Sequence, residues 1–454
     1  MQGRVGGMAN LATDAPQIDP LRELQKAFCL FQMGGDVWVG DLAGIEAVKA
    51  GVSSCDVAMY KQAAGKLLME RHLETLPAPS NARQVVKDFL VSPNTKVFDA
   101  VAFSPLPTPA STLNYWIGSP VTPEAGDWSV IMDFLRNSIC SANGRLFTYL
   151  IRFLAHMLLY PELKPGIMIV LLGGQGTGKG SFFRLLNAIW RHTTLQVSDV
   201  AHVIGNFNAA IERNYVVCMD EALFSGDRKA LDRLKSMVTE PTVTIEQKYQ
   251  PRRTISSYHR FFAASNHKHF AQVEADDRRF AFFQVSEARK GDHVYWDNVH
   301  KAIDDPAVIA AMVHEMLSLD LSNFNVRQRP KTEAHMDQRL KSLSGFDRYW
   351  FEVLQTGDFN PGSPGEPVEP WQDSCFVSTK TLLAGLKEYE KGARVYTAPQ
   401  EREVHQALKR LCLSAERDRK TKSKKPERGQ QLPSLPDARD EFAQYMGGKI
   451  EWLD

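Results

Sequence analysis

The stretch LLGGQGTGKGSFF at residues 171–183 has the residue types and the spacing that bind a phosphate group. Glycines let backbone N–H groups turn towards phosphate oxygens, and a lysine at the start of the next helix reaches the terminal phosphates. The stretch fits the phosphate-loop pattern G-x-x-x-x-G-K-[ST] except at its last position, where Gly180 stands and the first hydroxyl follows one residue later. We predict a nucleotide site formed by Gly173, Gly174, Gly176, Thr177, Gly178, Lys179, Gly180 and Ser181.

Two carboxylates, Asp220 and Glu221, end the apolar segment YVVCMDE at residues 215–221. A carboxylate buried at a strand end is costly unless it serves a cation, so Asp220 suits Mg²⁺ coordination and Glu221 suits orienting an attacking water. One residue along a helix turns a side chain by about 100°. Ser181 therefore does not simply replace the missing hydroxyl, and we assign it an indirect role at the metal. A solvated strand end is the alternative for the two acids.

Three more polar residues flank the later apolar segments, because Asn266 ends FFAASN while Arg278 and Arg279 lie in ADDRRF. An amide at the end of a strand next to that of Asp220 would lie near the γ-phosphate and position water, although Asn is more often a turn residue. Either arginine suits an arginine finger, which reaches the γ-phosphate in a neighbouring subunit and accelerates hydrolysis by roughly 10³ to 10⁵. A surface salt-bridge cluster is the alternative, and spacing does not choose between the two arginines.

Short apolar segments alternating with helical ones must position these groups. The segments IMIVLL, YVVCMD, RFFAAS and RFAFFQV predict an α/β fold with a mostly parallel sheet. Helical periodicity over 129–160, broken near 141–145, precedes this region, and a Pro- and Gly-rich linker follows it. We expect an N-terminal α+β accessory domain at residues 1–105 and a helical collar-like region at 106–166. The nucleotide-binding core with a helical tail follows at 167–356, then the linker at 357–372 and a small terminal domain at 373–454.

Composition narrows the class of protein. The 454 residues carry a formal net charge of +1, which argues against a wholly basic nucleic-acid binder but permits local basic patches. The six cysteines are far apart, as expected for a reducing compartment. The N-terminus lacks the apolar stretch of a signal peptide, and the best membrane candidate, 149–160, is too short and contains Arg152 and His156. We expect a cytoplasmic protein.

The order of these motifs resembles superfamily 3 helicases, a branch of the ring-forming AAA+ ATPases, and more narrowly the helicase part of phage and plasmid primase-helicases, including phage primase-polymerases. In these relatives Gly often follows the lysine, and a tryptophan-glycine element like NYWIGSP at 114–120 precedes the ATPase. The resemblance covers 112–350 well, the terminal domain moderately and 1–100 poorly. It implies that Lys179 is the Walker A lysine and that Asp220 and Glu221 are the Walker B pair. It also implies that Asn266 is the sensor and that the trans-acting arginine is Arg278 or Arg279.

The same family has a DNA-gripping hairpin between the Walker B strand and the sensor strand, and residues 234–257 occupy that place. Within them VTIEQKYQPRRTI has two strand-like flanks around a polar tip that is basic and contains an aromatic. Cations that contact phosphates and an aromatic that stacks on a base are what binding a single strand requires. The expected nucleic-acid contacts are Lys248, Tyr249, Arg252 and Arg253, and a solvated hairpin on the outer rim is the alternative.

The C-terminal domain has features of a DNA-binding domain, whereas the N-terminal region lacks the acids of a primase. In the terminal domain the amphipathic helix VHQALKRLCL precedes the basic run RDRKTKSKKPERG, which suggests a winged-helix DNA-binding domain or, alternatively, a disordered basic linker. Near the N-terminus GGD at 34–36 predicts a hairpin turn. No close carboxylate pair of a primase is present there, and we interpret Asp36 and Asp41 as turn residues.

The predicted function is that of an ATP-dependent DNA helicase or translocase that forms a ring, expected to be a hexamer. It would act in replication of a phage or other mobile element in the cytoplasm of a bacterial host. The expected ligands are ATP and Mg²⁺, and the expected partners are single-stranded or forked DNA and a separate primase or polymerase. The alternative is an ATP-regulated DNA-binding assembly or loader module without unwinding activity.

Overall fold

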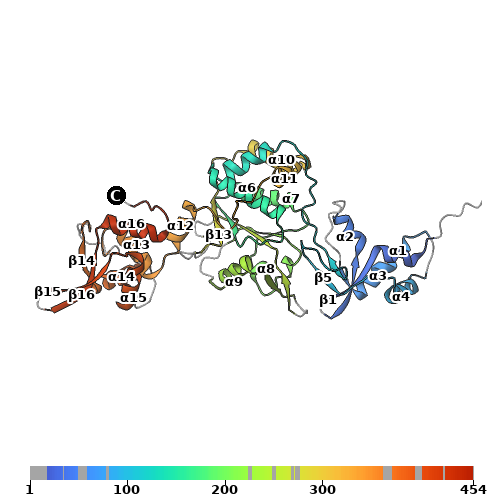
Figure 1. The fold of residues 1–454 in the computed structure, drawn as a ribbon, viewed down its shortest axis with the longest axis horizontal. Helices are drawn as coiled ribbons and strands as arrows, with labels where there is room; N and C mark the ends of the chain where they lie inside the picture. Colours follow the sequence, from blue (N-terminus) through green and yellow to red (C-terminus); the bar gives the residue numbers. More distant parts are fainter. Residues whose placement is uncertain are drawn as a thin grey trace, which may run out of the picture.

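The computed structural model describes residues 18–33, 35–49, 59–77, 81–222, 228–247, 252–266, 270, 277–360, 371–393, 401–422 and 425–452. They form three parts that follow one another along the long axis of the molecule (Figure 1). The N-terminal part, in blue, and the C-terminal part, in red, lie at opposite ends of a central part that holds the largest sheet. In the described ranges no helix has the length and apolar character needed to cross a membrane.

The N-terminal part is a mixed sheet with four helices. Its elements are α1 (Pro20–Ala27), β1 (Phe28–Met33), β2 (Asp36–Asp41), α2 (Leu42–Lys49), β3 (Met59–Lys61), α3 (Gln62–Glu74), α4 (Ala82–Val91) and β4 (Val97–Phe98). β1 and β2 pair antiparallel, which confirms the predicted hairpin, and Gly35 in the turn has a φ of 87° that suits glycine. Asp36 and Asp41 were wrongly interpreted as turn residues. They begin and end β2, and Asp41 accepts the Gly44 N–H at 2.8 Å at the start of α2.

A short connector leads into the central part. It contains the parallel pair β5 (Ala100–Ala102) and β6 (Thr112–Asn114), followed by α5 (Ser129–Asp133), the π-helix η1 (Phe134–Ile139) and α6 (Gly144–Leu159). The predicted helix over 129–160 is therefore present, with its break where Ser141 and Ala142 have φ angles of 47° and 58°. The side chain of Asn143 then caps α6 by accepting two backbone N–H groups.

The central sheet has five parallel strands in the order β13-β7-β12-β9-β8. Their bounds are β7 (Met168–Leu172), β8 (Thr194–Val197), β9 (Val216–Met219), β12 (Arg260–Ser265) and β13 (Phe280–Gln284). Four of these strands are the predicted apolar segments, and β8 is the one that the apolar pattern missed. Every residue of β7, β9 and β12 is buried. Such continuous burial explains the apolar runs, because a parallel sheet is covered on both faces.

Helices cover the two faces of this sheet (Figure 1). Along β7 the side chains of Ile169 and Leu171 join one hydrophobic cluster with residues of α6, α7 (Lys179–Ile189), α10 (His293–Asp304) and α11 (Pro306–Leu317). Met168, Val170 and Leu172 join the opposite cluster with residues of α8 (Ala201–Ile204), η2 (Ala209–Ile211) and α9 (Arg228–Thr239). This alternation follows from the two-residue period of a strand. The predicted collar-like helix α6 thus packs directly on the sheet.

A β-hairpin interrupts the parallel order between β9 and β12. It consists of β10 (Thr242–Ile245) and β11 (Arg253–Ser256), which pair antiparallel and follow α9. The sequence predicted two short strands here around a polar tip. Residues 248–251 of that tip lie outside the described residues.

The C-terminal part has its own hydrophobic cluster and a three-stranded antiparallel sheet in the order β14-β16-β15. Its elements are α12 (Glu333–Ser342), α13 (Gly345–Thr356), β14 (Cys375–Ser378), α14 (Thr379–Ala393), α15 (Glu401–Leu411), β15 (Glu416–Lys422), β16 (Lys425–Leu432) and α16 (Leu435–Met446). α13, which the sequence grouped with the central part, contributes Tyr349, Trp350 and Leu354 to this cluster. The predicted apolar face of α15 is buried. The basic run forms the β15–β16 hairpin, apart from residues 423–424, which are not described.

Candidate functional site

The glycine loop connects β7 to the amino end of α7, and two of its glycines have backbone angles that favour glycine. Gly176 and Gly178 have φ angles of 78° and 97°. A Cβ atom added at Gly178 would lie 2.3 Å from Cη2 of Trp296. Gly178 is also the N-cap of α7, so any side chain there would displace the packing between α7 and α10. The loop is therefore built tightly, with open N–H groups at the start of a helix, which is the arrangement that binds anions.

Lys179 lies at the first position of α7 with its side chain folded back over the loop. Its Nζ donates hydrogen bonds of 2.7 Å to the carbonyl oxygens of Gly173 and Gly174, and the residue is 7% exposed. Burial lowers the pKa of Lys179, and the negative charges of Asp220, Glu287 and Glu221 oppose this shift. The three carboxylates thus favour the protonated, positively charged form of Lys179 beside the loop.

The hydroxyl groups near the loop have different partners. Thr177 Oγ1 donates to the Gly174 carbonyl at 2.9 Å and closes the loop on itself. Ser181 Oγ lies 2.8 Å from Nε2 of His300 on α10, so this hydroxyl is engaged in the contact between α7 and α10. Among the described residues, a Cβ at Gly180 would have no heavy atom within 4 Å apart from its chain neighbours and the backbone of its own helix. Space does not explain why a hydroxyl residue is missing at position 180.

The other predicted nucleotide-site residues follow strands adjacent to β7. Asn266 follows β12, and Asp220 follows β9. Because these strands are parallel, their carboxyl ends lie at the same edge of the sheet as the glycine loop. The Gly173 N–H donates to the Ser265 carbonyl at 3.3 Å, which joins the loop to the end of β12. The fold therefore brings Lys179, Asp220 and Asn266 to one edge, as the sequence predicts.

Asp220 and Glu221 have distinct geometry at that edge. The carboxylate of Asp220 accepts the Glu221 N–H at 3.0 Å and a longer hydrogen bond of 3.4 Å from Nε2 of Gln196. Glu221 is exposed and has a φ of 52°, which is strained for a residue with a side chain. Strain of this kind is concentrated at functional sites.

Arg278 and Arg279 lie at the opposite edge of the sheet. They immediately precede β13, which is parallel to β7, so they flank the amino end of β13 while the glycine loop follows the carboxyl end of β7. The length of a five-residue strand, about 16 Å, separates the two edges. Arg278 is exposed, whereas the Arg279 side chain is 36% exposed and lies 3.8 Å from the carboxylate of Asp277. The structure does not bring either arginine to the glycine loop of its own chain.

Several residues around the loop were missed by the sequence interpretation. Trp296 and His300 come from α10, and Glu287 lies beside Gly174, where an added Cβ would approach its Oε1 to 2.9 Å. None of them belongs to a motif, because each reaches the loop from a segment after β13. Only the packing of α10 against α7, and of the segment after β13 against the loop, could reveal them.

Of the four hairpin residues that we predicted to contact nucleic acid, the two that the structure describes lie in different environments. Lys248 and Tyr249 lie outside the described residues. Arg253 forms a close ion pair and hydrogen bonds with the Glu212 carboxylate, and both side chains are largely buried. Arg252 is 71% exposed and lies 3.0 Å from Glu246. Arg253, in the ladder pair nearest the tip, thus anchors that end of the hairpin to Glu212, while Arg252 remains on the hairpin surface.

The β15–β16 hairpin presents a second group of cations. Arg417, Arg419, Lys420 and Arg428 are all exposed, and the two strands are joined in a continuous antiparallel ladder. The Nζ of Lys420 lies 5.1 Å from the ring centre of Phe376 on β14. This hairpin gives the C-terminal part a basic ribbon that projects away from its core (Figure 1).

Comparisons with known proteins show similarity to a family of unknown function and to a phage DNA primase-polymerase. Residues 171–279 match the model of a family of unknown function, DUF5906. The chain is 26% identical over 213 residues to the DNA primase-polymerase of Nitratiruptor phage NrS-1, in an alignment that covers 44% of this chain and 29% of that protein. The chain thus matches less than a third of the length of this curated relative.

Solved structures of the NrS-1 C-terminal region share the fold. An apo structure of that region has a TM-score of 0.65 at 16% identity and covers 92% of this chain and 100% of its own. A second apo structure has a TM-score of 0.64 at 15% identity and covers 91% of this chain and 100% of its own. The predicted similarity to phage primase-polymerases is confirmed in sequence and in fold.

Proposed function

We propose that the chain hydrolyses ATP and uses the reaction to translocate along DNA or to unwind it, as a ring-forming P-loop ATPase of the superfamily 3, AAA+ type. The observation that carries this proposal is the strand order. β12 lies between the strand of the glycine loop and the strand of Asp220, so that the side chains expected to bind phosphate, metal and water follow three adjacent strands. The sequence relative named a DNA primase-polymerase supports a role in replication of a phage or mobile element.

ATP would bind with its phosphates against the glycine loop. Lys179 would exchange the carbonyl oxygens of Gly173 and Gly174 for phosphate oxygens, and the N–H groups at the start of α7 would add further donors. Asp220 would hold Mg²⁺ together with phosphate oxygens and water, since carboxylates are preferred ligands of this ion. Bound Mg²⁺ would neutralise charge on the phosphates. Ser181 has at most an indirect role, because His300 engages its hydroxyl.

The attacking water would be oriented by Glu221 and Asn266, which follow neighbouring strands at the same edge. The arginine finger must come from another subunit, because Arg278 and Arg279 lie at the far edge of their own sheet. We therefore propose a homo-oligomer, most simply a hexameric ring, in which the amino edge of one sheet faces the glycine loop of the next subunit. A heterologous interface of this kind closes into a ring when its rotation permits.

DNA would be contacted by two separate elements. The β10–β11 hairpin, with Lys248, Tyr249 and Arg252, would grip one strand, whereas Arg253 supports the hairpin through Glu212. The C-terminal part has a strand, two helices and a two-stranded basic hairpin in the order expected of a winged-helix domain, and its basic ribbon would contact phosphates.

The first test is the Lys179→Ala variant in parallel ATPase and strand-displacement assays. We expect the variant to lose DNA-stimulated ATP hydrolysis and displacement of a forked duplex, because the terminal phosphates lose their cation. Persistent hydrolysis would contradict the assignment of the site. Hydrolysis by the wild type without displacement on any fork would instead support the alternative, a DNA-binding assembly or loader module.

A further inference from the structure

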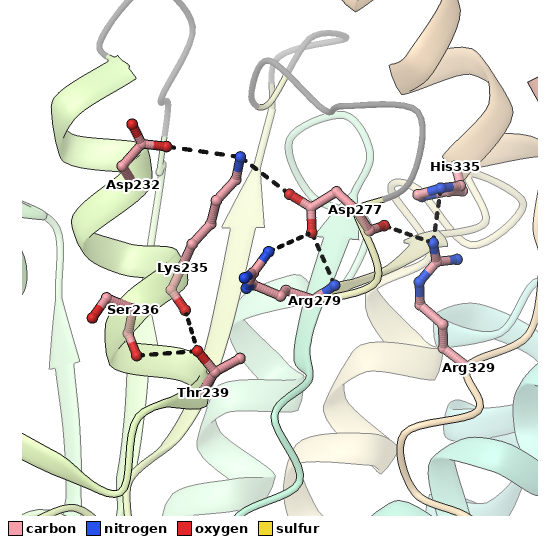
Figure 2. Close-up of polar contacts among 8 residues, drawn as sticks. All are labelled: Asp232, Lys235, Ser236, Thr239, Asp277, Arg279, Arg329 and His335. Atoms are coloured by element: carbon pink, nitrogen blue, oxygen red, sulfur yellow. Dashed lines mark hydrogen bonds and ion pairs between the residues drawn. The ribbon is translucent and has the colours of Figure 1, made fainter.

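Asp277, whose polar contacts are drawn in Figure 2, is a buried carboxylate three residues before β13, at the edge of the sheet opposite to the glycine loop of its own chain. Its side chain is 0% exposed. A carboxylate removed from water in this way is costly unless cations and hydrogen-bond donors compensate it. Two of the groups that contact Asp277 come from segments distant in the sequence, Lys235 on the carboxylate and Arg329 on the backbone carbonyl, and the remaining one is Arg279, two residues along the chain.

The first cation is Lys235 on α9. Its Nζ lies 3.2 Å from Oδ2 of Asp277, and its side chain is only 9% exposed. Lys235 also lies 3.9 Å from Asp232, a carboxylate that is 59% exposed. α9 connects the region after Glu221 to the β10–β11 hairpin, so this ion pair joins the helix before the hairpin to the amino edge of the sheet.

The second cation is Arg279, whose backbone N–H and C=O groups are both hydrogen-bonded. Its N–H donates to Oδ1 of Asp277 at 3.0 Å, and its carbonyl accepts the Met168 N–H at 2.8 Å. Its guanidinium is held more loosely, because Nη1 lies 3.8 Å from the same Oδ1 and the side chain is 36% exposed. By contrast, Arg278 is exposed and forms no hydrogen bond or ion pair within the described part of the chain.

The third contact comes from Arg329, in the segment that leads into α12. Its Nη2 donates to the backbone carbonyl of Asp277 at 2.9 Å and lies 2.9 Å from Nε2 of His335 (Figure 2). The backbone of Asp277 is thereby held from the side opposite to Lys235. Of the two side-chain cations near the carboxylate, Arg279 is the more distant and the more exposed, at 3.8 Å and 36%, against 3.2 Å and 9% for Lys235.

We propose that Asp277 is a positioning residue for Arg279, which is the finger arginine. It keeps the guanidinium at the amino edge of the sheet, directed to the nucleotide of a neighbouring subunit. Lys235 makes this arrangement reversible, because the carboxylate stays paired when Arg279 exchanges it for a phosphate oxygen. This inference rests on the proposed function, since it requires ATP to bind between subunits.

The test compares Asp277→Asn with a matched control, Asp232→Asn, in the full-length protein. Asparagine keeps the oxygen that accepts the Arg279 N–H but removes the charge that holds the guanidinium. We expect kcat for ATP hydrolysis to fall about 100-fold, the effect of misplacing a catalytic group by roughly 1 Å, with KM for ATP unchanged. Asp232→Asn removes an exposed acid near the same lysine and should keep the wild-type kcat.

Mixing of subunits separates positioning from a general structural effect. Lys179→Ala subunits have a defective glycine loop and a correctly positioned Arg279. Asp277→Asn subunits have an intact glycine loop and a mispositioned Arg279. Equal mixing should restore about one quarter of the wild-type activity, because one interface in four then combines two intact halves in a ring of heterologous contacts. Activity no greater than the sum of the two separate variants would overturn the proposal.

A second variant tests whether misfolding explains a loss of activity, because Asp277→Asn removes the buried negative charge 3.2 Å from the ammonium group of Lys235. Lys235→Met combined with Asp277→Asn removes that charge, and we expect it to assemble as the wild type does with the same low kcat. Wild-type kcat in either variant would refute the role of Asp277 while leaving the proposed function intact. If the wild-type protein shows no ATP hydrolysis that the Lys179→Ala change abolishes, both the proposed function and the role of Asp277 are refuted.

Discussion

At the scale of single residues, position 180 shows how a motif and its surroundings can disagree. The phosphate-loop pattern requires a hydroxyl there, and the chain has glycine. Within the part of the chain that the structure describes, an added Cβ at Gly180 would meet no residue outside its own helix within 4 Å, whereas at Gly178 it would overlap with Trp296. Ser181, which follows, is engaged with His300. Gly178 is thus required by packing, while Gly180 is open to substitution.

The first prediction uses this difference. Gly180→Ser should lower the Mg²⁺ concentration for half-maximal ATP hydrolysis about tenfold, as one added ligand worth about 1.4 kcal/mol would do. Gly180→Ala is the matched control, because it also replaces glycine by a better helix former, with a gain of up to about 1 kcal/mol, but adds no hydroxyl. Titration of Mg²⁺ in an ATPase assay measures the effect. Equal Mg²⁺ dependence in the two variants would show that position 180 does not face the metal.

At the scale of elements, a partly buried lysine, Lys164 in the segment before β7, joins the end of α9 to the residue after the β10–β11 hairpin. Lys164 Nζ donates to the carbonyls of Met237 and Glu240 at 2.6 and 2.7 Å and to Oγ of Ser257 at 2.6 Å. It therefore caps the carboxyl end of α9 and holds the residue that follows β11. Burial, together with the positive charge of the nearby Arg260, lowers the pKa of Lys164 to about 7.

The second prediction concerns the pH dependence of folding stability. The pKa of Lys164 is lower in the folded protein, about 7, than its ordinary value of 10.5. Between these values the unfolded chain binds more protons, so this group makes the free energy of unfolding rise with pH, by at most about 1.4 kcal/mol per unit. Lys164→Met should lose that rise when denaturant unfolding is measured across this range. The exposed Lys87→Met is the control, and a slope unchanged in Lys164→Met would contradict the prediction.

At the scale of the whole molecule, the proposed ATPase and one of the proposed DNA contacts belong to separate hydrophobic clusters. The glycine loop lies on the central sheet, and the basic ribbon of β15 and β16 belongs to the C-terminal part (Figure 1). α12 and Arg329 join the two parts next to Asp277. This separation predicts that DNA affinity can be reduced without damage to the nucleotide site.

The third prediction tests this separation by replacing four exposed cations of the ribbon with glutamine, Arg417, Arg419, Lys420 and Arg428. DNA binding should weaken, and the salt dependence of its affinity should become shallower by roughly 0.7 in log–log slope per lost phosphate contact with single-stranded DNA. ATP hydrolysis without DNA should stay at the wild-type level. The matched control removes four exposed cations at the other end of the molecule, Arg22, Lys26, Arg71 and Arg83. An equal loss of affinity in the control would indicate a nonspecific effect of charge.

The sequence by itself determined the glycine loop, four of the five central strands and the amphipathic face of α15, because each is encoded by local residue types at a regular spacing. Only the tertiary structure decided which distant groups meet. It placed Arg278 and Arg279 at the far edge from their own loop, paired Arg253 with Glu212, and surrounded Asp277 with Lys235 and Arg279. Contacts of this kind depend on strand order and helix packing, which no local pattern in the chain specifies.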